Sequence, residues 1–563
     1  MSTQIRGAEV VIKSLIAEGT HTVFGYPVGA IMPIYDAIYD YKDTFKHILV
    51  RHEQGGIHAA QGLARSSRTV GVCFATSGPG ATNLVTGLAD AMIDSTPLVC
   101  ITGQVASHLL GTDAFQETDV IGITMPVTKW SIQVTKASEI QGAIAKAFYI
   151  AKSGRPGPVL IDITKDAQFG MTEFDYQFCT EIRSYNPMPT LKVDALQEAA
   201  KLLNSAKKPY LLVGQGILLS NAEKELLAFV EKSGIPVAST LLGLGAFPPD
   251  HNLYAGYLGM HGNYGPNIKT NECDVLLAIG MRFDDRVTGD LSKYAKQAKV
   301  IHIDIDKSEL NKNVPTELAI HSDAKGALVE LTKWIDTKTH EAWLQEFKEC
   351  DKIEHDMVIN EAINPTNNEL KMAEVMNKLS EKTKGKSIIV TDVGQHQMIT
   401  SRYYKYKKNN GNITSGGLGT MGFALPAAIG AKVGAPSEQV IAIIGDGGFQ
   451  MTIQELGTIL QSKIDVKIIV LNNNFLGMVR QWQQLFFDKR YSGTEIENPD
   501  FVAIAKGYGI ESAKVSEREN VDAALDTMLN HKGAYFLEVV VEQEENVFPM
   551  IETGAAVSDI RLN

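Results

Sequence analysis

Cysteine is scarce in this sequence: the 563 residues include only five, scattered along the chain. No Cys-x-x-Cys pair occurs and the count is odd, so the sequence predicts neither a disulfide framework nor a cysteine-ligated zinc site. The five positions are Cys73, Cys100, Cys179, Cys273 and Cys350.

Long apolar runs are missing as well. No stretch approaches the roughly 18 consecutive apolar residues that a membrane-spanning helix needs. The amino terminus, "MSTQIRGAEVVIKSLIAEG", begins on an amphipathic helical pattern and has neither the apolar core of a signal peptide nor an Arg- and Ser-rich transit segment. We therefore expect a cytoplasmic protein with no membrane partner.

Positive charge is the third shortage. The formal net charge is −12, so a phosphate backbone would be repelled unless the protein carried a local basic patch. The nearest candidate for such a patch, "YYKYKK" at 403–408, is better explained as a solvated face. We expect no nucleic-acid partner.

What the sequence does have is a series of short, apolar, β-branched runs between helical patterns. Fully apolar strands separated by helices are typical of parallel sheets with helices on both faces. Two polar stretches without a strand pattern, 174–192 and 350–370, indicate linkers between domains. The sequence thus predicts an α/β protein of three doubly wound parallel-sheet domains, at 1–185, 190–350 and 368–563. The runs are "HILV", "TVGVCFAT", "PLVCITG", "PVLIDIT", "PYLLVGQG", "VLLAIG", "VIHIDID", "SIIVTDVG", "VIAIIGDG", "VKIIVLNN" and "YFLEVVV".

The stretch "GGLGTMG", residues 416–422, contains a literal G-x-G-x-x-G, the pattern of dinucleotide-binding loops. A helical pattern follows it, but the preceding "NNGNITS" predicts a polar loop rather than a buried strand. The strand about 20 residues further on, "IAIIG", has no acid at the ribose position. These departures disfavour NAD and leave two alternatives, a loop whose glycines allow tight packing or a loop that contacts another cofactor.

The strongest motif is "GDGGFQMTIQELGTILQSKIDVKIIVLNNN", which places Gly445-Asp446-Gly447 and Asn472-Asn473 at the ends of successive strands. In a parallel sheet both motifs lie at the carboxyl edge, where ligands bind. The Asp446 carboxylate and the Asn473 amide oxygen are hard ligands that suit Mg²⁺, and the glycines let backbone N–H groups approach phosphates. The alternative is an ordinary turn followed by an ordinary strand end.

This arrangement resembles the cofactor motif of thiamine diphosphate (ThDP) enzymes. The resemblance implies that Met421 supports the bent cofactor and that Gln395 and His396, in "VGQHQ", donate to the diphosphate. It implies Mg²⁺ ligands at Asp446, Asn473 and the backbone carbonyl of Phe475. The implied ThDP contacts are Gln395, His396, Gly419, Met421, Gly445, Gly447, Gly448 and Met478.

A ThDP enzyme also uses a carboxylic acid, and Glu53 in "VRHEQGGIHAAQG" matches the family position. In the family this Glu hydrogen-bonds N1′ of the pyrimidine and so favours the tautomer that removes the C2 proton. Taken without the resemblance, Glu53 is better explained as a surface or salt-bridged acid. Because the first and third domains meet across a subunit interface in the family, the resemblance implies a homodimer or homotetramer.

The resemblance narrows to the catalytic subunits of acetohydroxyacid (acetolactate) synthases and covers nearly the whole chain. It is carried by "VFGYPVGAIMPIYDA", "TSGPGATN", "GTDAFQE", "GRPGPVLIDITKD", "GMRFDDRVTG", "HIDID", "GMVRQWQ" and "VFPMI". The segment "MRFDDRVTG" is similar to the FAD-containing biosynthetic branch. The three domains are then a pyrimidine-binding, an FAD-binding and a diphosphate-binding domain. The implied flavin contacts are Arg155, Gly214, Gly216, Thr240, Leu241, Gly280, Arg282, Asp284, Arg286, Asp304 and Asp323.

The implied reaction is decarboxylation of pyruvate and transfer of the two-carbon unit to a second 2-oxoacid, either pyruvate or 2-oxobutyrate, in branched-chain amino acid biosynthesis. The resemblance gives catalytic roles to Glu53, Gln116, Lys165 and Met421. It gives substrate-pocket roles to Gly29, Phe115, Arg282 and Trp482. Two of these residues have alternative explanations: Arg282 could form a salt bridge with Asp284 or Asp285, and Trp482 could be a core aromatic on a helix. In the flavin site, Asp304 could instead be a helix cap.

One departure from the family is Val28, which stands where the pattern Tyr-Pro-Gly-Gly-Ala has its first glycine. A branched side chain there would be unfavourable at positive φ or would narrow the site. Two rival functions stay open: a ThDP- and FAD-dependent pyruvate oxidase, and a non-catalytic regulatory paralogue. A small regulatory subunit is a further possible partner.

Overall fold

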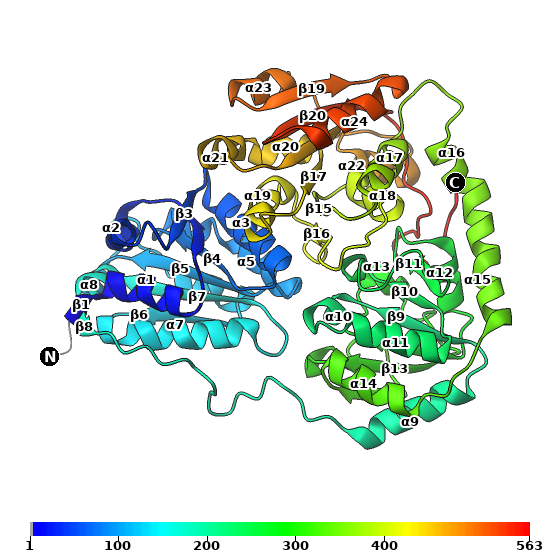
Figure 1. Cartoon of the computed structure of the whole chain (residues 1–563), viewed down its shortest axis with the longest axis horizontal. Helices are drawn as coiled ribbons and strands as arrows, with labels where there is room; N and C mark the ends of the chain where they lie inside the picture. Colours follow the sequence, from blue (N-terminus) through cyan, green and yellow to red (C-terminus); the bar gives the residue numbers. More distant parts are fainter. Residues whose placement is uncertain (1–3) are drawn as a thin grey trace.

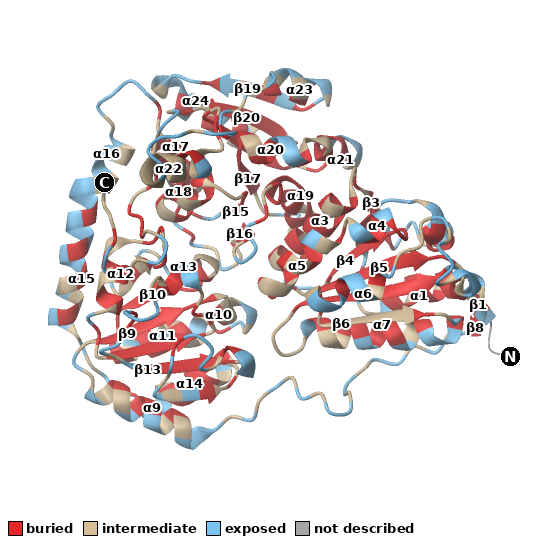
Figure 2. Cartoon of the chain, turned by 180° about the vertical axis from the view of Figure 1, so that it is seen from behind, coloured by how far each residue is buried: buried red, intermediate tan, exposed pale blue. Residues whose placement is uncertain are grey.

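Three six-stranded sheets, one in each third of the chain, form the centres of three α/β domains in the computed structural model, which describes residues 4–563 (Figure 1). All three sheets are parallel throughout. Most residues of the central strands are buried, while the outer faces of the covering helices include many exposed residues (Figure 2). This pattern confirms the predicted fold class and explains why the strand sequences are nearly continuous apolar runs.

The N-terminal domain follows this plan and adds a short antiparallel pair, β1 (Gln4–Arg6) with β8 (Met171–Glu173). Its sheet order is β3 (Lys46–Leu49), β2 (Thr22–Gly25), β4 (Gly71–Ala75), β5 (Leu98–Gln104), β7 (Pro158–Thr164), β6 (Trp130–Val134). Its helices are α1 (Gly7–Ala17), α2 (Met32–Asp40), α3 (Glu53–Ser67), α4 (Pro79–Thr82), α5 (Val85–Ile93), α6 (Val120–Thr124), α7 (Ala137–Lys152) and α8 (Lys165–Phe169).

The middle domain begins after the strand-free connection 174–192. Its sheet order is β11 (Tyr254–Tyr257), β10 (Val237–Ser239), β9 (Pro209–Val213), β12 (Val275–Ile279), β13 (Lys299–Asp304), β14 (Leu318–His321). Its helices are α9 (Val193–Ser205), α10 (Gln215–Leu219), α11 (Glu223–Ser233), α12 (Tyr264–Thr270), α13 (Asp285–Thr288), α14 (Ala324–Trp334) and α15 (Glu341–Glu354).

The C-terminal domain lies above the other two in Figure 1, coloured yellow to red. Its sheet order is β16 (Asn412–Thr414), β15 (Ile388–Thr391), β17 (Val440–Gly445), β18 (Lys467–Asn472), β20 (Tyr535–Val540), β19 (Glu511–Val515). Its helices are α16 (Asn360–Ile363), α17 (Met372–Thr383), α18 (Gln395–Tyr403), α19 (Ala424–Gly434), α20 (Asp446–Thr452), α21 (Leu456–Ser462), α22 (Gly477–Phe486), α23 (Phe501–Gly507) and α24 (Val521–Asn530).

The strand order of each sheet predicts where a ligand can bind. Numbered from the first strand of each six-stranded sheet, the N-terminal and C-terminal sheets share the order 2-1-3-4-6-5, whereas the middle sheet has 3-2-1-4-5-6. The second order is that of dinucleotide-binding folds, and in both orders the loops diverge at a switch point where a crevice forms. The switch points lie between β2 and β4, between β9 and β12, and between β15 and β17.

All eleven predicted strands are present, and two predictions about irregular segments need correction. The stretch "NNGNITS" was expected to be a polar loop, but it contains the largely buried edge strand β16, whose three residues pair with β15. The linker expected at 350–370 is helical down to Ile363, through α15, a π-helical turn at His355–Ile359 and α16. The domain boundaries at 185, 190, 350 and 368 stay predictions.

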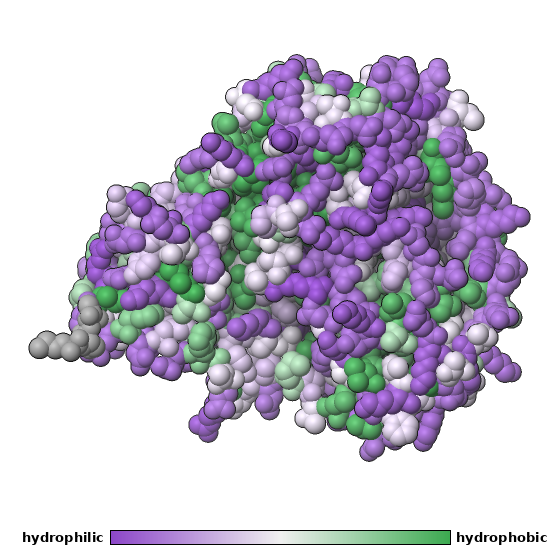
Figure 3. Space-filling model, viewed as in Figure 1, coloured by the Kyte–Doolittle hydropathy of each residue, from purple (hydrophilic) through white to green (hydrophobic). Residues whose placement is uncertain are grey.

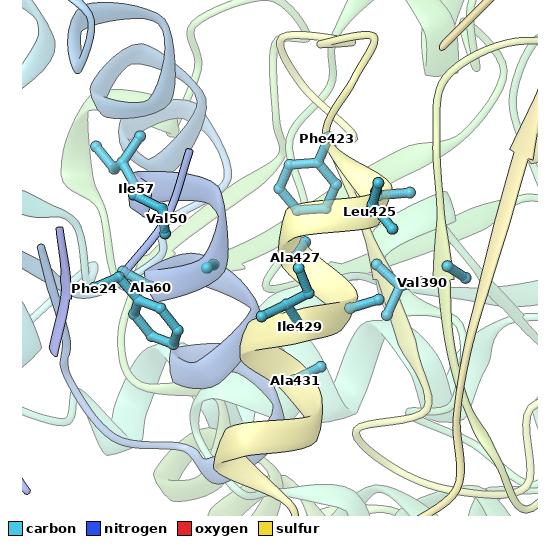
Figure 4. Packing of buried hydrophobic residues seen from close by; sticks show 14 of the residues in the cluster. Phe24, Val50, Ile57, Ala60, Val390, Phe423, Leu425, Ala427, Ile429 and Ala431 are labelled. Carbon is cyan, nitrogen blue, oxygen red and sulfur yellow. The ribbon is translucent and has the colours of Figure 1, made fainter. Parts of the chain in front are cut away.

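Helices α3 and α19 bind the first domain to the third. They lie side by side with small residues between them, as Figure 4 shows for Ala60 and Ala427. A Cβ at Gly62 would lie 1.8 Å from the carbonyl oxygen of Ala427, and one at Gly430 would lie 1.7 Å from that of Ala59. Only glycine permits this approach, so the contact is specified by sequence.

The surface has two further features relevant to function. In the view of Figure 3, hydrophobic side chains gather where the N-terminal domain meets the C-terminal domain. Within residues 4–563, no helix combines the length and apolar character needed to cross a membrane.

Candidate active site and cofactor cavities

A small cavity of about 60 Å³ lies at the switch point of the C-terminal sheet. The chain after β15, β17 and β18 converges on it, because parallel strands end at the same edge. It is lined by most of the residues predicted to hold ThDP and all of those predicted to hold Mg²⁺. These are Gln395, His396, Met421, Gly445, Asp446, Gly447, Gly448, Asn473, Phe475 and Met478.

Two oxygen ligands suitable for Mg²⁺ face this cavity. Asp446 is 1% exposed, and its Oδ2 accepts a hydrogen bond of 2.7 Å from the amide of Asn498. Burial raises the pKa of Asp446 to about 6, against the lowering effect of that hydrogen bond. The Asn473 side-chain oxygen accepts from the backbone N–H of Phe475 at 3.2 Å. Carboxylate, amide and carbonyl oxygens form a donor set that fits a small divalent cation.

His396 and its neighbours form a cradle for an anion. Its Nε2 is buried without a hydrogen-bond partner, and burial lowers its pKa to about 3, so the ring is neutral. A Cβ at Gly445 would lie 2.8 Å from Nδ1 of His396, and one at Gly394 would lie 2.9 Å from Cε1. An unpaired ring nitrogen beside two glycines fits a phosphate oxygen as the missing partner.

Gln395 differs from its predicted role in one respect. Its amide N–H groups donate to the Gln481 side chain at 2.9 Å and to the carbonyl of Glu545 at 2.8 Å. These bonds already use the donors that the resemblance assigned to a diphosphate. In this arrangement Gln395 ties α18 to α22 and to the C-terminal segment.

The stretch "GGLGTMG" forms part of a loop, 415–421, that joins the small cavity to a larger one. Met421 lines both cavities, and Gly419, at φ +72°, lines the larger. Gly416 and Gly417 are tightly packed: a Cβ would lie 2.7 Å from Leu242 in the first case and 2.8 Å from Asp94 in the second. Tight packing, one of the two alternatives for this motif, thus accounts for its first glycine, Gly417, and for the preceding Gly416.

The large cavity measures about 1400 Å³ and is lined by all three domains. Its wall includes the loops after β9 and β12, which flank the switch point of the middle sheet. There Gly216 and Gly280 touch, since a Cβ at Gly216 would lie 2.5 Å from the Cα of Gly280. The predicted flavin residues that line it are Arg155, Gly216, Thr240, Leu241, Gly280, Arg282, Asp284, Arg286, Asp304 and Asp323.

Gly214 is the one predicted flavin residue that does not line the large cavity. It is buried one position after β9, where a Cβ would lie 2.4 Å from the carbonyl oxygen of Gly280. Its backbone N–H donates to Ile279 at 3.1 Å. Gly214 therefore allows the two loops to approach each other and does not form the cavity wall.

The acidic residues of the large cavity have distinct local roles. Asp304 is not the helix cap that was its alternative: the cap of the following turn is Asp306, whose backbone N–H donates to Asp304 at 2.8 Å. Burial raises the pKa of Asp304 to about 7. Asp323 caps α14 and accepts from Ser220 at 2.7 Å. Arg155 pairs with Asp306 at 3.1 Å, across the boundary between the first and second domains.

Two predicted substrate-pocket residues share the wall of the large cavity. The Arg282 guanidinium lies 3.6 Å from Asp284, so the salt bridge that was its alternative does exist. A guanidinium has five donors, which leaves capacity for a second carboxylate. Trp482 is half-buried on α22 and forms part of the cavity wall, so its alternative as a core aromatic is wrong.

The remaining predicted residues lie on the N-terminal domain and line neither cavity. Glu53 begins α3, is 9% exposed, and accepts a 3.0 Å hydrogen bond from Asn83. A Cβ at Gly80 would lie 3.3 Å from its Oε1. A Cβ at Gly29 would lie 3.1 Å from Oε1 of Gln116 and 3.3 Å from the hydroxyl of Thr76. These side chains gather at the β2–β4 switch point and form what we call the N-terminal half-site.

A strained, exposed loop presents two of these residues. Gln116 has φ +61°, which is unusual for a residue with a side chain, and its neighbour Phe115 is 89% exposed. The carboxylate of Glu117 holds the loop by accepting backbone N–H bonds, including those of Thr112 at 3.2 Å and Ala114 at 3.1 Å. Lys165 is exposed at the start of α8, after β7.

Val28 does not carry the backbone strain that the family pattern suggested. Its φ is −143°, in the extended region that branched residues favour, and the positive φ of +48° falls on Gly29. The substitution therefore adds a half-buried side chain without a conformational cost.

Sequence reasoning missed several polar residues around the small cavity. The carboxylate of Asp392 accepts backbone N–H bonds from Val393, Gly422 and Ala424 at 2.8 to 3.1 Å, and so ties the chain after β15 to the end of loop 415–421. It directly follows an apolar strand, a position that could have identified it. Asn498 reaches Asp446 from a segment without a recognisable motif, and no sequence pattern indicated it.

Three segments match parts of the thiamine pyrophosphate enzymes: the N-terminal TPP binding domain over residues 5–123, the central domain over 196–331 and the C-terminal TPP binding domain over 392–539. The acetolactate synthase isozyme 2 large subunit of Escherichia coli is 44% identical over 557 residues, which cover 99% of both chains. The chain belongs to the acetolactate synthase large-subunit family.

Two other members of the acetolactate synthase family show the same extent of similarity. The large subunit of Corynebacterium glutamicum is 44% identical over 99% of this chain and 90% of its own length. That of Haemophilus influenzae is 43% identical over 100% of this chain and 98% of its own length. Family membership confirms the predicted enzyme class, a ThDP-dependent acetolactate synthase, and the predicted ThDP-binding domains.

Proposed function

We propose that this chain decarboxylates pyruvate and joins the two-carbon unit to a second 2-oxoacid, giving acetolactate from pyruvate and acetohydroxybutyrate from 2-oxobutyrate. One observation carries the proposal. Asp446, Asn473 and the unpaired His396 converge on a cavity that continues, through Met421 and Met478, into a cavity containing Arg282. A site for a metal-bound diphosphate thus adjoins a site for a carboxylate substrate.

In the small cavity, the side chains of Asp446 and Asn473 and the carbonyl of Phe475 would hold Mg²⁺. His396 Nε2 and the backbone N–H groups of the glycines after β17 would donate to phosphate oxygens. Bound ThDP supplies the electron sink for decarboxylation and carbon–carbon bond formation. Met421 fills the space between the two cavities with a flexible apolar side chain.

The N-terminal half-site supplies the acid. Glu53 is held through Oε2 by Asn83, so its Oε1 can accept or return a proton at a fixed position. Gln116 and Gly29 lie in the same half-site, where a hydrogen-bonding amide and an unobstructed backbone would contact the reacting acid. Lys165 and Phe115, exposed on neighbouring loops, would complete the pocket.

The acceptor would lie in the large cavity. Arg282 can pair bidentately with the carboxylate of a 2-oxoacid, and Trp482 presents a flat apolar wall to its side chain. The rest of the cavity, with dinucleotide-type topology on the middle-domain side, would hold FAD. Carboligation transfers no net electrons, so we assign the flavin a structural role.

A complete site requires two chains in this proposal. Glu53 lines neither cavity of its own chain, while Met421 lines both cavities and Asp446 lines the small one. Large apolar side chains stay exposed near the half-site, Tyr26 at 37%, Met32 at 49% and Phe115 at 89%. We infer a homodimer in which the half-site of one chain faces the small cavity of its partner, with a tetramer as a further assembly.

Complementation between two inactive variants tests this arrangement. Glu53→Gln lacks the proton-transfer carboxylate, and Asp446→Ala lacks the metal carboxylate. After the two variants are dissociated and mixed, each hybrid dimer has one site with both wild-type residues. Random pairing should therefore restore roughly a quarter of wild-type acetolactate formation. No restoration in verified hybrid dimers would show that each site is built within one chain.

The rival functions predict different products. A pyruvate oxidase would bleach its flavin during anaerobic turnover and form no acetolactate. A non-catalytic paralogue would bind ThDP, Mg²⁺ and FAD without turning over pyruvate. A colour assay for acetolactate, run anaerobically with and without each cofactor, separates all three functions. Since the similar relatives are named large subunits, we also propose a small-subunit partner, detectable as a change in feedback inhibition.

A further inference from the structure

Two buried carboxylates of the N-terminal domain, one in α5 and one at its C-terminal cap, contact the loop 415–421 of the C-terminal domain. Asp90 and Asp94 lie one helical turn apart, and both are 0% exposed. Asp94 accepts backbone N–H bonds from Gly416 at 2.8 Å and Gly417 at 2.7 Å. The hydroxyl of Ser415 donates to Asp90. Three successive residues of the loop are thus held by one helix.

The glycines of this loop are explained by the same contact. A Cβ at Gly417 would lie 2.8 Å from Oδ1 of Asp94, so a side chain there would displace the backbone from the carboxylate. Two successive N–H groups that converge on one carboxylate form a concave anion site. In this chain, the first part of the G-x-G-x-x-G motif therefore binds a carboxylate of the protein itself.

Asp94 also contacts a cation on α3. Arg65 of α3 donates to Asp94 at 2.9 Å and also to the backbone carbonyl of Thr414, just before the loop. Buried carboxylates are tolerated only when charge and hydrogen bonds compensate their desolvation. Asp94 has both, and therefore joins Arg65 and the loop into one rigid unit.

The end of α5 is fixed on its other side by the large cavity. Arg155 donates to the carbonyl of Ile93 at 3.0 Å and to the hydroxyl of Ser95 at 2.8 Å. Ile93 and Ser95 line the large cavity, directly beside Asp94. The end of the helix that holds the loop is thus fixed by Arg155, which in turn pairs with Asp306 of the middle domain.

Beyond its anchored residues, the loop exposes side chains to the proposed cofactor sites. Leu418, Gly419 and Met421 line the large cavity, and Met421 also lines the small one. The far end is held separately, because the backbone N–H of Gly422 donates to Asp392 at 3.0 Å. The segment that contacts cofactor therefore lies between two carboxylate anchors.

We propose that Asp90 and Asp94 are positioning residues, which hold loop 415–421 so that Met421 and Gly419 meet ThDP in the correct place. The inference rests on the proposed function, because it assumes that this loop contacts ThDP. It adds that two N-terminal domains contribute to each cofactor site. The one in the same chain holds the loop through Asp90 and Asp94, and the one in the partner chain supplies Glu53.

The test uses the full-length protein, without turnover. Asp94→Asn keeps the shape of the side chain but places an amide where two N–H groups and Arg65 require an acceptor. Amide hydrogen–deuterium exchange within 415–421 should become faster, and the Kd of ThDP with MgCl₂, measured by calorimetry, should rise by roughly tenfold or more, as when a supporting residue of a metal site is lost.

Asp162→Asn is the matched control. Asp162 is also 0% exposed in the N-terminal domain, and its hydrogen bonds, to Thr102 at 2.7 Å and Gln104 at 3.0 Å, do not involve loop 415–421. This variant should lose stability without changing amide exchange in the loop. If amide exchange in the loop became faster by the same amount in both variants, Asp94 would contribute only to overall stability and not to the position of the loop.

Two further measurements keep the proposal testable. If Asp94→Asn does not fold, Gly417→Ala is the alternative variant. It leaves every carboxylate in place and should also raise the Kd of ThDP. For Asp90, the Asp90→Asn and Ser415→Ala variants should weaken ThDP by similar factors, and the double variant by no more than either alone. The proposal would be overturned if the Kd of ThDP in the double variant rose by the product of the two single effects, or if the Kd were unchanged in folded variants. Failure of the wild type to bind ThDP would instead contradict the proposed function.

Discussion

At the scale of single residues, Asp446 is the residue on which metal binding should depend in the proposed site. It is the only carboxylate among the three proposed ligands, and Asn498 already orients it. Asp446→Ala should weaken Mg²⁺-dependent ThDP retention by more than about tenfold, because even the loss of an outer-shell partner costs 10- to 100-fold. Equilibrium dialysis measures the effect.

The control for this variant is Asp356→Ala. Asp356 lies in the exposed π-helical turn and lines neither cavity, so its removal should leave ThDP retention unchanged. Unchanged ThDP affinity in Asp446→Ala as well would mean that the metal is held elsewhere.

Trp482 is the residue on which acceptor choice should depend. The two acceptors differ by one methylene, worth roughly 0.8 kcal/mol when buried, and a pocket can discriminate that difference by about 10- to 200-fold. Trp482→Leu should keep acetolactate synthesis but lower the preference for 2-oxobutyrate over pyruvate. A competition assay with both acids measures the ratio of the two acetohydroxyacids.

Trp334→Leu is the matched substitution outside the site. Trp334 is 47% exposed at the end of α14 and lines neither cavity, so the product ratio should equal that of the wild type. A wild-type ratio in a folded, active Trp482→Leu variant would remove Trp482 from the acceptor pocket.

At the scale of elements, the α3–α19 contact is the most demanding interface. A methyl group at Gly430 would lie 1.7 Å from a backbone oxygen of α3. Gly430→Ala should therefore destabilise the protein by about 1–3 kcal/mol or more, the usual cost of overpacking, and lower the midpoint of thermal unfolding.

The same substitution can be made where space is available. Gly142 lies in α7 with no atom within 4 Å of an added Cβ. Gly142→Ala should stabilise the helix by roughly 0.5–1 kcal/mol and leave the midpoint equal or higher. A Gly430→Ala midpoint as high as that of Gly142→Ala would show that the helices can separate at no cost.

At the scale of the whole molecule, the three domains are joined at several points. Arg68, at the end of α3, donates to Asn410 of the C-terminal domain at 2.8 Å and pairs with Glu223 of the middle domain. Arg402 of α18 forms a fully buried pair with Glu354 of α15. The cavities between the domains therefore have walls that are fixed relative to one another.

The contribution of several buried carboxyls to stability should depend on pH, because the effect of burial on their pKa outweighs that of the cations near them. The pKa of Asp304 is raised to about 7, that of Glu545 to about 7 and that of Asp351 to about 6, in each case chiefly by burial. Unfolded carboxyls titrate near 4. Between about pH 4 and 7 the folded chain keeps protons that the unfolded chain has lost, so stability falls as pH rises through this window.

Buried histidines act in the opposite direction: the pKa values of His58, His261 and His396 are lowered to about 3, so their contribution to stability rises with pH through about 6.5. The test therefore compares two proteins. Asp304→Asn removes one carboxyl titration, so its thermal midpoint, measured without added cofactors at constant ionic strength, should rise relative to that of the wild type between pH 5.5 and pH 7.5. An equal difference between the two midpoints at both pH values would contradict the assignment.

The sequence by itself determined the fold class and eleven of the strands, and it pointed to the ThDP-binding domains, because these depend on local pattern. Buried parallel strands such as β17 are apolar runs, and Asp446 directly follows such a run. Edge strands were harder to predict. β16 was taken for a loop because three residues with a single apolar side chain, Ile413, carry no periodic signal, and only pairing with β15 makes them a strand.

Only the tertiary structure decided which residues share a site. Glycine patterns cannot say whether a loop meets a phosphate or a carboxylate, and Gly417 meets Asp94, 323 positions earlier in the chain. The sequence likewise assigned Glu53 and Asp446 to the same kind of site, whereas in the folded chain Asp446 lines the small cavity and Glu53 lines neither cavity. Such contacts depend on long-range packing, which no local window of sequence contains.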